Sequence, residues 1–298
     1  MARARRGEEQ QESFPFKITE SPPAEPPVSP IRERIWTENK AKLIERYLYY
    51  FVLITKHGTY IDGFAGPQYE DKANSWAAKL VLESEPRRLR HFYLYDIKEN
   101  QFKQLEALRD SQPPPNKERK EPKRAINVTR GDFNILVTDL LESASIRQKE
   151  ATFCLLDQRT FECHWSTVRS LAEYKTSGHK IELFYFLPNS WLDRSLAALR
   201  DTNRLKDWWG REDWQELRRM KPYERVEVFT RRFKEELSYR SVKPWPIFER
   251  QDGGGALMYH MIHATDHPEA PSLMSRAYKK AVLPKESQEQ LELEFGLS

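Results

Sequence analysis

Five short apolar runs between Thr59 and Leu187 alternate with segments of helical spacing, and this alternation constrains the fold most strongly. The runs are predicted to be the strands Thr59–Ile61, His91–Tyr95, Ile126–Val128, Thr152–Leu156 and Ile181–Leu187. Strands that alternate with helices form right-handed crossovers and a mostly parallel sheet. The fourth and fifth runs lack polar alternation, as expected of strands that are covered on both faces.

The segments outside these strands complete the predicted fold. A first helix is expected to begin at Thr37, a suitable N-cap with Glu38 in the first turn, because the apolar residues that follow recur at spacings of three and four. Residues 201–240 are helical in composition and rich in tryptophan and charge, which predicts a helical insertion. Two closing strands, 244–248 and 256–262, are expected to pair around Gly253–Gly255 before a last helix at 272–281.

The composition divides the chain into three parts. Residues 1–30 are rich in proline and charge, so we expect a flexible tail that cannot bury enough apolar surface to fold. Residues 31–282 are expected to form the α/β domain, with a Rossmann-like, mostly parallel sheet, a closing antiparallel hairpin and the helical insertion. Residues 283–298 form a polar C-terminal tail.

Charge and cysteine content limit the environment of the protein. The net charge is +4 and the pI is near 8.8, an excess too small to predict nucleic-acid binding by itself, so nucleic acid stays open as a partner. Cys154 and Cys163 have no CxxC spacing, which indicates a reducing compartment and predicts a cytoplasmic protein. No apolar run reaches the roughly 18–20 residues of a membrane span, and the basic N-terminus lacks the apolar stretch of a signal peptide.

Aspartates stand at the ends of the predicted strands. Asp62, Asp96 and Asp157 directly follow strands, and Asp132 follows the third strand after a short turn. In open α/β sheets, ligands bind beyond the carboxyl ends of the strands, where the strand order reverses. Any one of these aspartates could be only a helix cap or a turn residue. Four of them beside a glycine-rich first loop predict a ligand site.

That first loop, Asp62-Gly63-Phe64-Ala65-Gly66, has small residues that let the backbone turn tightly and approach a ligand. It contains neither GxGxxG nor the Walker A lysine, so it suits a nucleoside with a neutral or cationic tail better than a pyrophosphate. Asp96 is expected to accept hydrogen bonds from both ribose hydroxyls. Asp132, beside Phe133, is expected to hold the adenine edge.

Five sequence motifs together resemble the three-Cys-motif partner protein family over roughly residues 31–282. They are YIDGFAGP, FYLYDIKEN, RGDFN, FCLLDQRTFECHWSTV and MYHMIHATDHPEAPSLMSRAYKKAV. The resemblance implies a SAM-methyltransferase fold with S-adenosylmethionine (SAM) as cofactor, in which Asp62 would face the amino group of the methionine moiety. It also implies a genomic partner that carries a three-cysteine motif and resembles radical-SAM enzymes. The resemblance assigns no reaction to the family.

The stretch Asp157-Gln158-Arg159-Thr160-Phe161 occupies the place where amino-methyltransferases carry a D/N-P-P-Y/F motif. In that motif a carboxylate or amide and a carbonyl accept bonds from the target amine, and the aromatic residue stacks on the base. We therefore expect Asp157, Arg159 and Phe161 to border the methyl acceptor. The family more often resembles DPFG or DPYG here, so Gln158-Arg159 puts amine methylation in doubt. Arg159 could pair with a phosphate or carboxylate, or with a neighbouring residue.

Other chemical groups favour structural interpretations. His260 and His263 lie on opposite faces of a predicted strand, so we expect no metal site, and Thr265 or Asp266 is a better candidate to cap the last helix. Cys163 and His164 are adjacent and seldom face each other. The basic stretch 115–124 is expected to be a solvated loop, with a phosphate backbone as the alternative contact.

Three functions remain open from the sequence. The first is a SAM-dependent methyltransferase, or a SAM-binding homologue, that acts on nucleic acid or a nucleotide. The second is a small-molecule methyltransferase. The third is a non-catalytic partner that docks a radical-SAM-like iron–sulfur protein with the three-cysteine motif.

Overall fold

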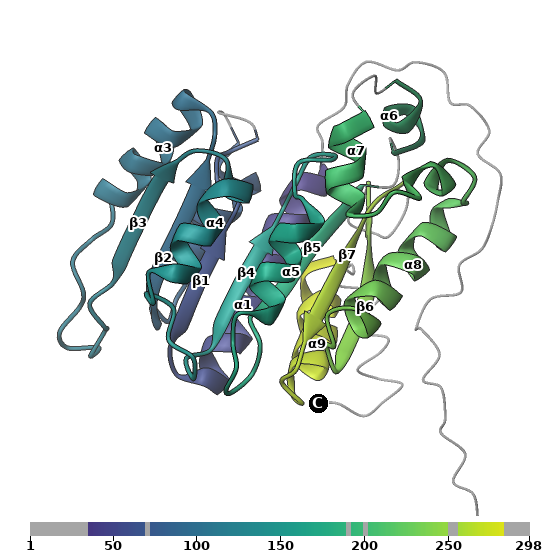
Figure 1. The fold of residues 1–298 in the computed structure, drawn as a ribbon. Helices are drawn as coiled ribbons and strands as arrows, with labels where there is room; N and C mark the ends of the chain where they lie inside the picture. Colours follow the sequence, from purple (N-terminus) through teal and green to yellow (C-terminus); the bar gives the residue numbers. More distant parts are fainter. Residues whose placement is uncertain (1–34, 69–71, 189–191, 199–201, 250–255, 283–298) are drawn as a thin grey trace, which may run out of the picture. The chain divides into compact units, whose positions relative to one another are not determined.

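The computed structural model describes residues 35–68, 72–188, 192–198, 202–249 and 256–282 (Figure 1). The predicted tails, 1–30 and 283–298, and the predicted turn Gly253–Gly255 lie outside these ranges.

Seven strands in the described part of the chain form one sheet with the order β3-β2-β1-β4-β5-β7-β6 (Figure 1). Their bounds are β1 Gly58–Asp62, β2 Leu89–Asp96, β3 Ala125–Arg130, β4 Thr152–Leu156, β5 Glu182–Pro188, β6 Ser241–Phe248 and β7 Leu257–Thr265. Strands β1 to β5 pair in parallel, whereas β7 runs antiparallel to both β5 and β6. This confirms the predicted Rossmann-like α/β class and its closing antiparallel hairpin. The order reverses between β1 and β4, where such sheets bind ligands.

Helices cover both faces of the sheet. Their bounds are α1 Ile35–Thr55, α2 Ala77–Glu83, α3 Glu99–Asp110, α4 Phe133–Glu142, α5 Trp165–Glu173, α6 Leu192–Ala198, α7 Thr202–Trp209, α8 Pro222–Glu235 and α9 Ala270–Val282, with 3-10 turns η1 Ala73–Ser75 and η2 Trp214–Arg218. None of the described helices has both the length and the apolar character that crossing a membrane requires.

Two hydrophobic cores flank the sheet, and neighbouring residues of a strand belong to different cores. Phe184 and Phe186 of β5 belong to the core that also contains side chains of α1, α2, α3 and α9, whereas Leu183 and Tyr185 belong to the core with side chains of α4, α5, α7 and α8. All four side chains are fully buried. Because side chains of a strand alternate between faces, a strand covered on both sides must be apolar at every position. This explains the uninterrupted apolar run from which the strand was predicted.

Proline positions in the sheet follow from the pairing of its strands. The sequence predicted that β5 ends before Pro188, but the structure continues the strand to Pro188, which pairs with Tyr259. Pairing between β4 and β5 stops at Leu156 and Tyr185, so the missing N–H of Pro188 removes no bond on that side. Pro244 and Pro246 lie in β6, which is an edge strand of the sheet and therefore tolerates proline.

Two predicted helix starts were wrong. Helix α1 begins at Ile35, so Thr37 lies within the helix rather than at its N-cap, since a preferred capping residue is also tolerated in the first turn. Neither Thr265 nor Asp266 begins the last helix, which starts at Ala270. Instead, the Thr265 hydroxyl accepts a hydrogen bond from the amide of His267, and Asp266 accepts one from the amide of Arg240.

The predicted helical insertion is only partly an insertion. Helices α6 and α7 and the turn η2 are additional to the alternating pattern, and they start earlier than predicted, at Leu192. Helix α8 is the connection between β5 and β6 and packs against β6 and β7. It therefore covers the sheet as α5 does, and only the segments before it are extra.

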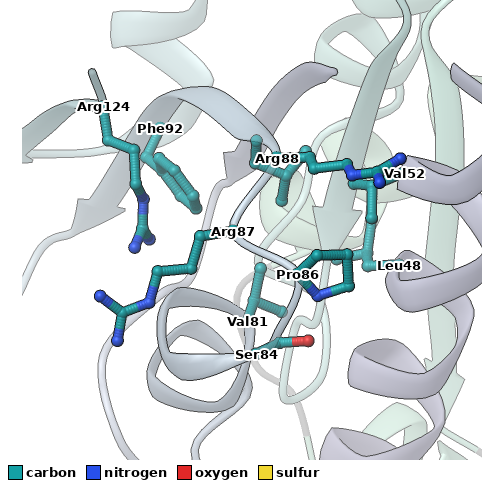
Figure 2. Close-up of a pocket in the computed structure, with 10 residues that line it drawn as sticks. Leu48, Val52, Val81, Ser84, Pro86, Arg87, Arg88, Phe92 and Arg124 are labelled. Carbon is teal, nitrogen blue, oxygen red and sulfur yellow. The ribbon is translucent and has the colours of Figure 1, made fainter. Parts of the chain in front are cut away.

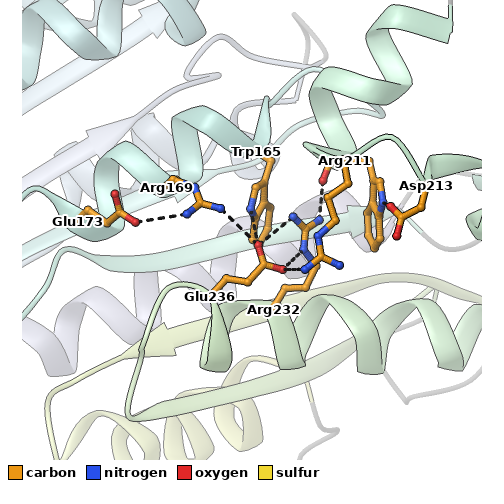
Figure 3. A network of polar contacts seen from close by, with 8 residues as sticks. Trp165, Arg169, Glu173, Arg211, Asp213, Arg232 and Glu236 are labelled. Atoms are coloured by element: carbon orange, nitrogen blue, oxygen red, sulfur yellow. Dashed lines mark hydrogen bonds and ion pairs between the residues drawn. The ribbon is translucent and has the colours of Figure 1, made fainter.

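A buried arginine joins this region to α5 (Figure 3). The Arg232 guanidinium lies between the rings of Trp165 and Trp209, at 3.8 Å and 4.4 Å from their centroids. Glu236 accepts two hydrogen bonds from Arg232, at 2.6 Å and 3.1 Å, one from Arg211 at 2.6 Å and one from the Trp165 indole at 3.2 Å. Charge-assisted and bidentate bonds of this kind are strong and directional, so the cluster fixes α8 against α5.

Candidate functional site

Four aspartates predicted from the sequence lie along one edge of the sheet. Asp62 and Asp96 are the last residues of β1 and β2, Asp132 directly precedes α4 after β3, and Asp157 follows β4. The strands β3, β2, β1 and β4 are consecutive and parallel, so their carboxyl ends share one rim. The order along this rim is Asp132, Asp96, Asp62 and Asp157.

Asp62 is almost completely buried, with 1% of its surface exposed. One carboxylate oxygen accepts a hydrogen bond from the Tyr60 hydroxyl at 2.9 Å, and the other accepts one from the Phe64 amide at 3.1 Å. Burial raises the pKa of Asp62 to about 7, and the charges of Asp157 and Asp96 add to this, although the two hydrogen bonds oppose it. The carboxylate therefore holds the start of the glycine loop through the Phe64 amide, and its pKa lies close to neutral pH.

The loop after β1 leaves no room for larger residues at its two glycines. A Cβ on Gly63 would overlap the ring of Phe133, and a Cβ on Gly66 would overlap a carboxylate oxygen of Asp96. The backbone of Ala65 is held on both sides, because its amide donates to the carbonyl of Tyr95 at 2.8 Å and its carbonyl accepts from the Trp76 indole at 2.7 Å. The loop is thus fixed against the end of β2.

Asp96 is the residue onto which this loop closes. Its two carboxylate oxygens each accept one backbone hydrogen bond, from Gly66 at 3.0 Å and from Lys98 at 2.9 Å. These donors come from two different loops, so the carboxylate is held in one orientation. The residue is 8% exposed.

Asp132 and Phe133 have different roles in the structure. Asp132 caps α4: one of its oxygens accepts bonds from the amide and the side chain of Asn134, at 2.9 Å and 2.8 Å. The other oxygen has no hydrogen bond within the described residues. Phe133 is 1% exposed and packs against Tyr95 with ring centroids 5.0 Å apart. Its side chain therefore belongs to the core beneath the loop.

Two exposed isoleucines stand next to these carboxylates in the sequence. Ile97 directly follows Asp96 and is 61% exposed, and Ile135 lies in the first turn of α4 and is 70% exposed. Single exposed apolar side chains are common on protein surfaces, so these two matter here only for their place beside the carboxylate rim. Neither residue was predicted from the sequence, although an isoleucine directly after a strand-terminal aspartate is visible there.

The carboxylate of Asp157 is paired with a lysine that was not predicted as a site residue. Nζ of Lys40, in α1, lies 2.6 Å from Oδ1 of Asp157, and the Lys40 side chain is 1% exposed. The ammonium group also lies 4.2 Å from the ring centroid of Tyr259 and 4.9 Å from that of Phe186. Lys40 stands three and four residues before Leu43 and Ile44, on the apolar face of the helix. A lysine on that face could have indicated a buried, paired charge.

The residues after Asp157 are mostly structural. The buried Gln158 side chain donates to the carbonyl of Phe186 at 3.3 Å and accepts from the amide of Cys163 at 3.1 Å. Phe161, expected to border the acceptor, is 2% exposed and packs edge-on against Trp208. It is a core residue because α7 covers it, which the sequence could not show. Arg159 is half-buried, and its amide donates to Glu162 at 2.7 Å.

Histidines and cysteines near the sheet have partners in the core. His263 lies 2.6 Å from Glu182, which also accepts a hydrogen bond from Tyr47. Burial lowers the pKa of His260 to about 4, so this imidazole is neutral at pH 7. Cys163 is buried. Within the described ranges, no cluster of three or more histidine, cysteine, aspartate or glutamate residues could hold a metal ion.

Comparisons with known proteins assign this chain to no family. No family model matches the chain, and no curated protein matches it. Among solved structures, the chain is similar to a crystal structure of a protein from Legionella pneumophila str. Philadelphia 1 that is assigned to the family model DUF519. The identity is 12%, the match covers 85% of this chain and 94% of that chain, and the TM-score is 0.46. A similarity at this level bears on neither substrate nor cofactor.

Proposed function

We propose that the rim of β1, β2 and β3 binds SAM and that the chain is a SAM-dependent methyltransferase. The observation that carries the proposal is the carboxylate of Asp96. An ionised carboxylate offers about four acceptor positions, and among the described residues the amides of Gly66 and Lys98 use two of them. The remaining positions suit two adjacent hydroxyl groups, and a ribose presents such a pair. Because residue 66 is glycine, the loop backbone lies close to the Asp96 carboxylate, so one ligand could contact both the loop and the carboxylate.

The residues beside Asp96 suit the adenine ring. The oxygen of Asp132 that has no hydrogen bond within the described residues can accept one from an exocyclic amino group. The exposed side chains of Ile97 and Ile135 offer apolar surface for the faces of a base. A purine has this combination of apolar faces and polar edges, so a nucleoside would satisfy both kinds of group.

The charge of the rim favours a cationic tail on that nucleoside. Asp62 and Asp96 end neighbouring strands, and a pyrophosphate there would be repelled by both carboxylates. SAM carries a positive sulfonium and an ammonium group, and when bound it supplies an electrophilic methyl group. The buried Asp62 would gain a cationic partner, which favours its ionised form. The protein would then contribute to catalysis mainly by aligning the acceptor atom with the methyl group.

The acceptor side differs from that of an amino-methyltransferase. Lys40 already occupies Oδ1 of Asp157, and its positive charge offsets that of the carboxylate, which weakens the attraction of this aspartate for a second amine. Nearby, Tyr259 and Phe186 are engaged by the same lysine. The arrangement supports an acceptor that is not an amine held by this aspartate. Nucleic acid, a nucleotide and other small molecules all remain within the proposal.

Calorimetry with SAM tests the proposal. We expect the wild-type protein to bind SAM and the variant Asp96→Asn to bind it more weakly by about 1–3 kcal/mol, because a charged acceptor for ribose is lost. Asp207→Asn is the matched control, since Asp207 is an exposed aspartate of α7. An absence of binding by the wild-type protein would refute the SAM site. Equal affinity of the two variants would remove Asp96 from it.

A second candidate function is a non-catalytic docking partner. The observation that favours it is the structural use of the acceptor loop, where Lys40 neutralises Asp157, Gln158 braces the loop and Phe161 is core. The partner would be the three-cysteine-motif iron–sulfur protein that the family resemblance predicts. SAM-independent binding to that protein, with no transfer of a labelled methyl group from SAM, would favour this function over the first.

A further inference from the structure

A small pocket lies at the opposite end of the sheet, beside the amino ends of β2 and β3 (Figure 2). Its volume is about 10 Å³, which is room for one atom of the size of a water oxygen. Three arginines, Arg87, Arg88 and Arg124, line it together with apolar side chains of α1, α2 and β2. Figure 2 shows Arg87 and Arg124 on one side of the pocket, while Arg88 points the other way, toward Val52.

Arg124 is held in place but is not saturated with hydrogen bonds. Its Nη2 donates to the carbonyl of Leu82 at 3.0 Å, and its guanidinium lies 4.7 Å from the ring centroid of Phe92. Its Nε and Nη1 atoms are buried and have no hydrogen-bond partner among the residues that the structure describes. Burial lowers the pKa of Arg124 to about 10, and the charge of Arg87 adds to this, so the group is still a cation at pH 7. A buried cation with free donors is costly.

Arg87 is the second cation beside the pocket, next to Arg124. Its Nε forms an ion pair with Glu85 at 3.3 Å, but it makes no hydrogen bond within the described part of the chain. The Glu85 side chain is 50% exposed, whereas that of Arg87 is 17% exposed. Glu121 is the other carboxylate whose charge acts on Arg124. Glu121 already accepts a hydrogen bond from the amide of Asn116 at 2.9 Å.

We propose that Arg87 and Arg124 form a clamp for a phosphate group of a nucleic-acid backbone. Planar guanidinium groups bind phosphate oxygens through paired hydrogen bonds. One phosphate oxygen fits the volume of the pocket, and the others would lie at its mouth, within reach of both arginines. The bound anion would supply acceptors to the guanidinium groups that line the pocket and would offset the repulsion between the two cations.

The surroundings of the clamp favour a nucleic acid over an isolated phosphate ion. Between Glu85 and His91, three arginines accompany one glutamate, and between Asn116 and Arg124, five basic residues accompany two glutamates. The parallel pairing of β2 with β3 matches His91 to Ala125, which brings these two stretches side by side. Arg90, Lys117, Arg119, Lys120 and Lys123 are exposed there. Successive phosphates of a backbone can meet such a basic surface, whereas a single ion cannot.

Fluorescence anisotropy with a short labelled RNA of mixed sequence tests the clamp, because phosphate contacts carry no sequence information. Titrations at several salt concentrations would compare the wild-type protein, Arg87→Ala and Arg124→Lys, with melting temperatures to show that each variant is folded. We expect Arg87→Ala to weaken binding about tenfold and to reduce the salt slope by about one. Arg124→Lys keeps the charge but loses the planar fork, so we expect weaker binding with the same slope.

Lys234→Gln provides the matched loss of one charge. Lys234 is exposed on α8, which packs at the opposite edge of the sheet, and its loss should leave the affinity for RNA unchanged. Equal affinities of Arg87→Ala and Lys234→Gln would overturn the clamp, as would a wild-type protein that does not bind RNA at low salt. Inorganic phosphate is the second probe. Phosphate binding that depends on Arg87, with RNA binding that does not, would overturn the assignment to nucleic acid.

Discussion

Nζ of Lys40 lies 2.6 Å from Oδ1 of Asp157, and this contact joins the first helix to the carboxyl end of β4. The two residues are 117 positions apart in the sequence. The ammonium group is enclosed by Tyr259 and Phe186 as well, so four elements of the fold meet at one charge. The pair sets the electrostatics at the end of β4, because the charge of the Asp157 carboxylate is offset by the protein's own lysine.

Replacing this lysine tests how strongly the fold depends on the pair. We expect Lys40→Met to destabilise the protein by about 3 kcal/mol, since it leaves the carboxylate of Asp157 without its partner. Urea denaturation would measure the change. Lys42→Met is the control, because Lys42 is a neighbour on α1 whose side chain is 42% exposed. The double variant Lys40→Met/Asp157→Asn should recover most of the loss. A double variant as unstable as the sum of the single ones would show that the two residues do not interact.

The buried carboxylate of Asp62 should make stability depend on pH. Its pKa of about 7 in the folded state is higher than the 3.8 of a free aspartate. The folded state therefore binds more protons between these values, and stability should fall as the pH rises from about 4 to about 7, by at most on the order of 4 kcal/mol. We expect Asp62→Asn to reduce this slope in denaturation curves at several pH values, whereas Asp207→Asn should not. An unchanged slope in Asp62→Asn would contradict the raised pKa.

The close approach of Gly66 to Asp96 predicts a loss of both stability and ligand binding in Gly66→Ala. The new Cβ would overlap the carboxylate and the Cβ of Gln101, which forces the loop away from β2. We expect a destabilisation of about 1–3 kcal/mol and weaker SAM binding. Gly178→Ala is the control: its φ of +79° makes alanine strained there, at a cost of about 1 kcal/mol, but it lies away from the rim. If both variants bound SAM like the wild type, the loop would not be part of the site.

Acid stability should depend on Glu236. Burial raises the pKa of this carboxyl group, but its bonds and charge interactions with Arg232, Arg211 and Trp165 outweigh burial and lower it overall. A lowered pKa stabilises the fold above the ordinary value near 4.3, and that contribution is lost as the pH falls below it. We expect Glu236→Gln to cost about 1–3 kcal/mol at pH 7 and much less at low pH. The neighbouring exposed Glu235→Gln should have little effect at either pH. Equal effects of both variants would refute the role of the cluster.

Much of the sheet could be predicted from local sequence. The first five strands appear as apolar runs because they are buried on both faces, and Thr152–Leu156 was predicted with the observed bounds. Aspartates at strand ends could be placed on one rim as well, because parallel strands share a direction. The edge strand β6 was less visible, since its prolines and a lysine interrupt the pattern, and the observed strand begins three residues before the predicted one, at Ser241.

The contents of the site were harder to predict, because they depend on contacts between distant segments. Phe161 looks like a stacking residue in its motif, but α7 covers it. Lys40 looks like one of many surface lysines until α1 is placed against the end of β4. The same holds for Arg87 and Arg124, which become neighbours only when β2 pairs with β3. Periodicity reports which face of an element is buried, but not which residue of another element lies opposite.

The hydrogen bond from the Trp76 indole to the carbonyl of Ala65 gives the protein an intrinsic optical probe of its glycine loop. Trp165, Trp208, Trp209 and Trp214 are buried in the other core, around α5, α7 and α8. Their emission would report unfolding of that half of the molecule. Trp76 instead contacts the turn through which a ligand at the rim would act, so a variant that retains only this indole would signal events at β1 and β2 without interference from the rest of the chain.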